Sequence, residues 1–345
     1  MGDAVRKGLF GSSFSHMGQG VTHQVEEVRA GKAARVEKES IFARFLRSTE
    51  IDARLLGMLG ALALIWVGFH VYGEVVNGFG AFLTPRNLWN LSVQTASIGV
   101  MATGMVLVIV TRHIDLSVGS ILGFCAMSMA IIQVWILPEF LGLGHPMIWI
   151  ITVICGLIIG CLIGAIHGYL IAYLGIPAFI VTLGGLLFWR GAAFLLARGE
   201  TISPVDDTFS KLGGGPYGSI GALGSWIIGG LACAVVLYML WQGRQKRKRF
   251  NFPMRPMWAE GFLAVVGCGA IIGFVLLVNS YPWPKGIVRQ YATANNIETP
   301  ISEIFISHGF AIPVIILFAV GVCMTFLATR TKFGRYVFAI GGNSS

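Results

Sequence analysis

The sequence predicts an all-α membrane protein, a polytopic bundle with about eight transmembrane helices. Hydrophobic residues make up 55% of the 345 residues and charged residues only 12%, whereas a soluble domain is about one quarter charged. The apolar residues form repeated runs of about 20, the length that a helix needs to cross the hydrocarbon core. The 46 glycines fit this class, because small residues let membrane helices pack closely.

The eight expected spans form one transmembrane domain, residues 55–345. The fifth span differs from the others because it begins directly after Pro177 and contains Arg190. Before the spans, residues 1–54 form a polar cytoplasmic leader, for which an interfacial helix and a simply solvated segment are both open. The predicted spans are residues 55–72, 88–110, 116–137, 147–173, 178–196, 222–241, 259–279 and 309–329.

Lysines and arginines predict the orientation, since cytoplasmic loops carry an excess of both. With both termini in the cytoplasm, 19 of the 25 lie on the cytoplasmic side and five on the external side, and the last is Arg190. The basic block 244–249 is then a cytoplasmic anchor. A surface that binds lipid head groups or nucleic acid is the more specific alternative. The net charge of +9 follows from this placement, so no nucleic-acid partner is expected.

The sequence carries no motif for catalysis or metal binding. Its six cysteines lie in apolar runs without the spacing of a zinc site, and we expect them to be small buried apolar residues. The common phosphate-binding and catalytic signatures are not found. If ATP drives this protein, another chain must bind it.

One polar stretch, residues 111–120, interrupts the apolar sequence between the second and third spans. Its Asp115 is costly at membrane depth unless it caps a helix, pairs or faces water. In one interpretation, Asp115 caps the third span by accepting the backbone N–H of Val118, and Ser117 and Ser120 assist in the first turn. In the other, Asp115 lies at a break within the membrane, where uncovered backbone lines a cavity.

A few polar residues inside the spans are candidates for a translocation path. Arg190 must reach the surface, pair or face a polar cavity, and Thr182, eight residues earlier, shares its helix face. Gln94 makes the second span a candidate polar wall. His167 lies beside glycines spaced four apart over 156–168, which clear a helix face for packing or for the path itself. Packing is the default interpretation for both the glycines and His167.

Four pieces of the sequence resemble membrane permeases of ABC-type monosaccharide importers, the ribose, xylose and galactose class. The first is Ile-Asp-Leu-Ser-Val-Gly-Ser at residues 114–120, and the last, 328–343, ends in Gly-Arg-x-x-x-Ala-Ile-Gly-Gly-Asn. The others are residues 176–184 and the pair Arg190-Gly191. Their order and spacing resemble the xylose branch most, and the likeness covers residues 55–343.

The resemblance implies a subunit of the bacterial inner membrane that moves a monosaccharide inward by alternating access. Its expected partners are a cytoplasmic ATP-binding subunit that hydrolyses the ATP, a periplasmic sugar-binding protein, a second permease chain forming a homodimer, and membrane lipid. The chain itself would bind no cofactor. The expected substrate path holds Gln94, His167, Thr182 and Arg190, the helix junction holds Asp115, Leu116, Ser117, Gly119 and Ser120, and the region coupled to the ATPase holds Gly334, Arg335, Tyr336, Ile340, Gly341, Gly342 and Asn343.

The chain departs from the family pattern in two places. Family members continue beyond Gly-Gly-Asn with an Ala-Ala-Arg-rich segment and further spans, so we expect this chain to be incomplete at its C-terminal end. The external segment 280–308 is also longer than expected. Two alternatives stay open: an ion-coupled secondary transporter, which needs more acidic groups at membrane depth than Asp115 and Glu260, and a membrane scaffold without transport.

Overall fold

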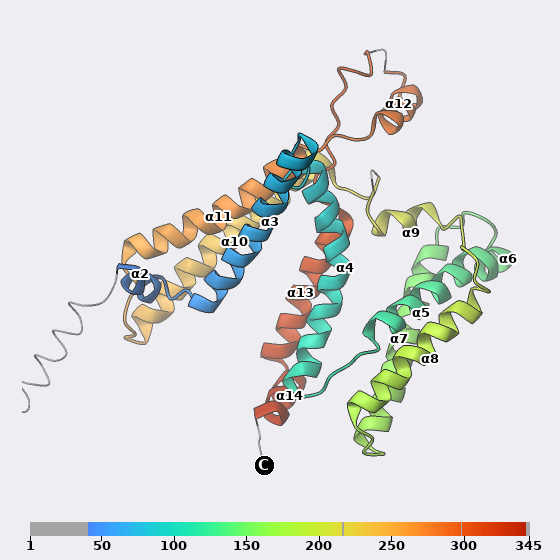
Figure 1. Ribbon diagram of the computed structural model, residues 1–345, viewed down its shortest axis with the longest axis horizontal. Helices are drawn as coiled ribbons and strands as arrows, with labels where there is room; N and C mark the ends of the chain where they lie inside the picture. Colours follow the sequence, from blue (N-terminus) through green and yellow to red (C-terminus); the bar gives the residue numbers. More distant parts are fainter. Residues whose placement is uncertain (1–40, 216, 298, 343–345) are drawn as a thin grey trace, which may run out of the picture. The chain divides into compact units, whose positions relative to one another are not determined.

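The computed structural model describes residues 41–215, 217–297 and 299–342. These residues form helices joined by loops, with isolated β-bridges and no strand among them. The chain divides into two compact units, and three long helices run through both (Figure 1). The first unit comprises Met1–Gly68 and Ala234–Gly269, the second comprises Phe69–Cys233 and Ala270–Ser345, and the shared helices are α3 (Ala53–Asn77), α10 (Gly221–Arg249) and α11 (Met257–Asn279).

In the first unit, helix α2 (Ile41–Thr49) packs against α11 through aromatic rings. Phe45 stacks on Trp258 with ring centroids 6.1 Å apart and meets Phe262 edge-on at 5.2 Å. Such pairs contribute about 0.5–1.5 kcal/mol beyond the area they bury. This helix forms within the stretch where an interfacial helix or a solvated leader was expected, and residues 1–40 of that leader lie outside the described residues.

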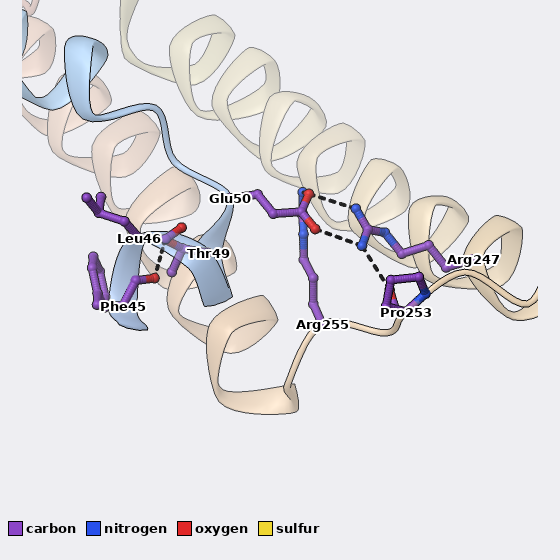
Figure 2. A network of polar contacts seen from close by, with 7 residues as sticks. All are labelled: Phe45, Leu46, Thr49, Glu50, Arg247, Pro253 and Arg255. Atoms are coloured by element: carbon purple, nitrogen blue, oxygen red, sulfur yellow. Dashed lines mark hydrogen bonds and ion pairs between the residues drawn. The ribbon is translucent and has the colours of Figure 1, made fainter. Parts of the chain in front are cut away.

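A polar network fixes the turn after α2 (Figure 2). Glu50 ends the helix with a left-handed φ of 55°. Its carboxylate accepts two hydrogen bonds from the Arg247 guanidinium, at 2.8 and 2.7 Å, and one from Arg255 Nη2 at 2.6 Å. These bonds, the Arg247 ones foremost, lower the pKa of Glu50 from 4.5 to about 2. Glu50 therefore stays charged at physiological pH.

The second unit contains two groups of packed helices. Helix α4 (Pro85–Val110) packs against α13 (Ile312–Arg330), and α5 (Val118–Ile131) packs against α7 (Ile148–Ala172) and α8 (Ala178–Leu196). Pro85 suits the first position of α4, because its missing N–H is not needed there, and the Thr84 hydroxyl caps the helix. The remaining elements are the π-helical turn η1 (Ile132–Ile136), α6 (Leu137–Leu141), α9 (Asp207–Leu212), α12 (Lys285–Ala294) and α14 (Lys332–Gly342).

The core around α4 and α13 centres on Trp89 and His308, which are both buried. The His308 ring stacks on Tyr281 with centroids 4.3 Å apart, and Trp89 Nε1 donates to the Gly309 carbonyl at 2.9 Å. Burial lowers the pKa of His308, and its hydrogen bond with the Tyr281 carbonyl opposes this only in part. A neutral His308 with Nδ1–H donating to that carbonyl, 3.1 Å away, satisfies this arrangement.

The eight predicted spans are confirmed as eight helices, within the described residues, that are long and apolar enough to cross a membrane. The sixth continues to Arg249 rather than ending at 241, because lysine and arginine are good helix formers. The eighth begins at Ile312 rather than 309, because Gly309 has a left-handed φ of 71° and Ala311 is extended. Both differences come from local backbone preference, which hydropathy does not measure.

Candidate functional site

The polar stretch between α4 and α5 forms a tight helix junction, residues 111–117, in the second unit. The Asp115 Oδ1 atom accepts two hydrogen bonds from Ser117, one from its backbone N–H at 2.8 Å and one from its hydroxyl at 2.6 Å. Ser117 is fully buried and Asp115 is half-buried. The carboxylate therefore closes a two-residue turn directly before the helix, an arrangement that short acidic side chains favour.

The predicted capping bond to Val118 is wrong. Helix α5 begins at Val118, its N-cap is Ser117, and the N–H that Asp115 accepts lies one residue earlier than expected. The reason is that Ser117 has a helical backbone, φ −86° and ψ −11°, so the turn is already made when the helix begins. Ser120 donates its hydroxyl to the Ser117 carbonyl at 2.7 Å and so does assist in the first turn. Leu116 and Gly119 are exposed.

Thr182 of α8 ties its helix to the junction. Its hydroxyl lies 2.9 Å from the Ala178 carbonyl of its own helix and 3.3 Å from the Ile114 carbonyl, and can donate to either. Thr182 is buried, so this hydroxyl is shielded from solvent. A residue predicted for the substrate path thus faces the packed interior between α8 and the junction.

His167 of α7 packs against α8 at Gly185, one helical turn after Thr182. It is 9% exposed, and its Nε2 accepts a hydrogen bond from Trp189 Nε1 at 3.1 Å. The imidazole fills the space that a Cβ at Gly185 would occupy, and Ser117 Cβ would lie 3.4 Å from that Cβ. The structure therefore brings His167, Thr182 and Ser117 together around α8. Because Gly185 has no side chain, α7 and the junction can both approach α8 there.

Arg190 and Gln94 do not join this cluster. Both side chains are exposed, Arg190 on α8 and Gln94 on α4. Trp189, the neighbour of Arg190, turns inward to His167, whereas Arg190, about 100° further around α8, is exposed. The four predicted path residues thus separate into a buried pair and an exposed pair.

The glycine face of α7 is only partly covered within the described residues. The Met129 side chain of α5 fills the space beside Gly156, and Cys125 Sγ would lie 3.9 Å from a Cβ at Gly160. A Cβ at Gly164 or Gly168 would have nothing within 4 Å. Side chains rather than another backbone therefore cover the first half of this face, in contrast to the close helix packing expected.

The predicted coupling region forms α14, which folds back on α13 and α4. Gly334 and Val337 are buried, and a Cβ at Gly341 would overlap the Val110 carbonyl, where α4 ends. Glycine at 341 therefore lets α14 rest on the end of α4, next to the junction. The residues Arg335, Tyr336, Ile340 and Gly342 are exposed, and Asn343 lies outside the described residues.

The described residues contain neither a cluster of metal ligands nor a disulfide. No group of three or more His, Cys, Asp or Glu residues there could hold a metal ion. The cysteines form no disulfide, and the expectation that all six are buried is wrong: Cys161 and Cys323 are exposed and the other four are half-buried. Both occupy faces of transmembrane helices that nothing else in the unit covers.

These features define a multi-pass α-helical membrane protein, and the predicted inner-membrane location is confirmed. The chain belongs to the family described as "Branched-chain amino acid transport system / permease component", whose model matches residues 87–345. This match includes the junction and α14, the two segments on which the resemblance to ABC permeases chiefly rested, and confirms that resemblance.

The curated relatives include xylose permeases. The xylose transport system permease protein XylH of Escherichia coli (strain K12) is 35% identical over 269 residues, which are 76% of this chain and 58% of that protein. XylH of Haemophilus influenzae is 32% identical over 299 residues, 85% of this chain and 67% of that protein. The inner membrane ABC transporter permease protein YjfF of E. coli is 36% identical over 170 residues, 46% of this chain and 48% of that protein. The chain thus spans 48–67% of these proteins. No solved structure matches it.

Several residues that shape the site were not predicted. Gly185 and Trp189 carry no sequence signal of their own, because their roles depend on neighbours from other helices. The same holds for Gln133 in η1, which is buried and accepts the Asp206 backbone N–H at 3.2 Å. Pro138, five residues after Gln133, is the one local sign of an irregular helix at that place.

Proposed function

We propose that this chain is the membrane permease subunit of an ATP-driven importer that moves a monosaccharide, a pentose such as xylose, inward by alternating access. The observation that carries the proposal is the similarity to two XylH permeases over 76% and 85% of the chain. Membership of a permease family supports it. Neither the family nor these relatives favours the ion-coupled transporter or the scaffold.

The proposal assigns the energy source to other subunits. A cytoplasmic ATP-binding subunit would hydrolyse ATP, a periplasmic sugar-binding protein would deliver the substrate, and a second copy of this chain would complete the path. The exposed side chains of α14, among them Arg335, Tyr336 and Ile340, offer a surface for the ATP-binding subunit. Because α14 rests on the end of α4, a movement imposed on α14 would reach the junction directly.

The proposal also divides the four path residues by role. Arg190 and Gln94, which are exposed, would line the path, because a charge within a span is stabilised by a polar cavity. Thr182 and His167, which are buried, would support its wall by fixing α7 and α8 to the junction. Substituting the first pair should therefore change transport more than stability, and the second pair the reverse.

The test is uptake of labelled xylose into proteoliposomes that contain this chain, the ATP-binding subunit and the sugar-binding protein. We expect uptake that requires ATP and survives a protonophore. A matched pair of variants is Arg190→Gln, expected to reduce uptake, and Arg198→Gln, at an exposed position outside the spans. Uptake that collapses with the proton gradient and ignores ATP would instead establish the ion-coupled transporter.

A further inference from the structure

The π-helical turn η1 contains a buried amide with an unused donor. Gln133 is 4% exposed, and its Oε1 accepts the backbone N–H of Asp206 at 3.2 Å. Because a backbone N–H can bond only to the oxygen, this contact fixes the orientation of the amide. Its Nε2 group then has no hydrogen-bond partner among the described residues. A buried donor of this kind is costly, so an acceptor from outside the chain would be favourable there.

The π turn itself has a simpler cause. Pro138 has no backbone N–H, and in a regular helix its ring would clash with the carbonyl of Val134. The wider π turn at Ile132–Ile136 relieves that clash and leads into α6. Proline therefore explains the irregular backbone, but it does not explain why a glutamine with an unpaired amino group is buried there.

Gln133 lines a pocket of about 490 Å³, within the size range of small-molecule sites. The apolar part of its wall comes from Val134, Pro138, Leu143 and Ile148. Asp206, Asp207 and Thr208, where α9 begins, supply the polar part. Figure 1 shows α6 and the segment leading to α9 at the same end of the α5, α7 and α8 group, which is the end predicted to be external.

The chemistry of this lining selects a neutral, polyhydroxylated ligand. The Gln133 amino group donates, the exposed Asp207 carboxylate accepts, and the Thr208 hydroxyl can do either. Asp206 is already committed, since its Oδ1 accepts the N–H groups of Thr208 and Phe209. The lining contains two carboxylates and no lysine or arginine, which disfavours anions. The unpaired Gln133 amino group needs an acceptor oxygen, which a hydroxyl supplies and a simple cation does not. The apolar wall suits the C–H face of a sugar ring.

We propose that this pocket is an entrance subsite for a monosaccharide, in which Gln133 Nε2 donates to one sugar hydroxyl and Asp207 accepts from another. The choice of a monosaccharide rests on the proposed function, whereas the preference for a neutral polyol rests on the pocket alone. The subsite holds the sugar weakly at the external end of α5, next to the path.

The experiment is saturation-transfer difference NMR on the purified chain in lipid nanodiscs, with D-xylose as the probe and myo-inositol as a second neutral polyol. We expect transfer to the C–H protons of both polyols and none to D-xylonate, which carries a carboxylate. Gln133→Glu keeps an oxygen for the Asp206 N–H but removes the amino donor, so it should raise the dissociation constant about tenfold. Gln242→Glu is the matched control outside the pocket. Asp207→Asn should also weaken binding.

The outcomes separate this proposal from the proposed function. Binding that is unchanged in Gln133→Glu, with circular dichroism showing a normal fold, overturns the subsite. Xylose uptake by the assembled importer without any saturation transfer to D-xylose also overturns it and leaves the proposed function intact. Gln133-dependent transfer to myo-inositol, combined with no ATP-driven pentose uptake, supports the subsite and refutes the proposed function.

Discussion

Two carboxylates stand at turns beside helices, Glu50 after α2 and Asp115 before α5, and the protein holds them by opposite means. Glu50 has a 43% exposed side chain and is held by Arg247 and Arg255, which lie 197 and 205 positions away in sequence. Asp115 is held by Ser117, two positions away, through one N–H and one hydroxyl. The first arrangement depends on charge and the second on local geometry.

This difference predicts different sensitivities in the two units. Exposed charge pairs are weakened by salt and by protonation, and their contribution to stability is modest. The contact of the junction with α8 is formed by the buried residues Ser117 and Thr182, and it depends instead on volume and on satisfied hydrogen bonds, whose loss is more costly. Substitutions at the junction should therefore destabilise the protein more than changes at Glu50, and the charge pairs of Glu50 should be the more sensitive to salt.

The largest effect is expected for Gly185→Ala. The new methyl group would overlap the His167 ring, which cannot easily move because it is buried and bonded to Trp189. Overpacking of this kind costs about 1–3 kcal/mol. Gly184→Ala is the control, since nothing lies within 4 Å of a Cβ there. Thermal unfolding followed by circular dichroism should show a lower Tm for Gly185→Ala only, and equal Tm values would refute the tight packing around Gly185.

A smaller effect is expected for Thr182→Val. The substitution keeps the shape but removes the hydroxyl shared between Ala178 and Ile114, at a cost of about 1 kcal/mol. Because the junction then loses a tie to α8, trypsin should cleave faster after the exposed Arg112. Thr95→Val is the control, since that exposed hydroxyl bonds only within its own helix. If trypsin cleaved both variants at the same rate, Thr182 would not stabilise the junction.

The sequence was sufficient for the class and the spans, because hydropathy and helix length are properties of continuous segments. It was also sufficient to single out the polar stretch with Asp115. The acceptor geometry was not predictable, since it depends on the backbone angles of Ser117. The contacts of Thr182 with Ile114, and of Gly185 with His167, join residues far apart in the chain. Periodicity placed Thr182 and Arg190 on one face of α8, whereas packing buries the first and exposes the second.

The smallest effect is expected at Glu50, and its pH dependence has a definite sign. Its pKa is about 2 in the folded protein and 4.5 ordinarily, so the folded state binds fewer protons between these values. The stabilisation is therefore fully present above about pH 4.5 and is lost as the pH falls towards 2. Because the group is exposed, the contribution stays within about 1 kcal/mol.

Hydrogen exchange of the α2 amides in wild type and Glu50→Gln measures this contribution. In the wild type, protection of α2 relative to the rest of the chain should fall between about pH 6 and about pH 3 and should also fall at high salt. In Glu50→Gln it should be low at both pH values, because the neutral amide cannot pair with Arg247 and Arg255. Glu139→Gln, at an exposed position on α6, should behave as wild type. If cleavage after Arg112 at the junction showed the same dependence on salt, charge would act in both units and the contrast between the two carboxylates would be lost.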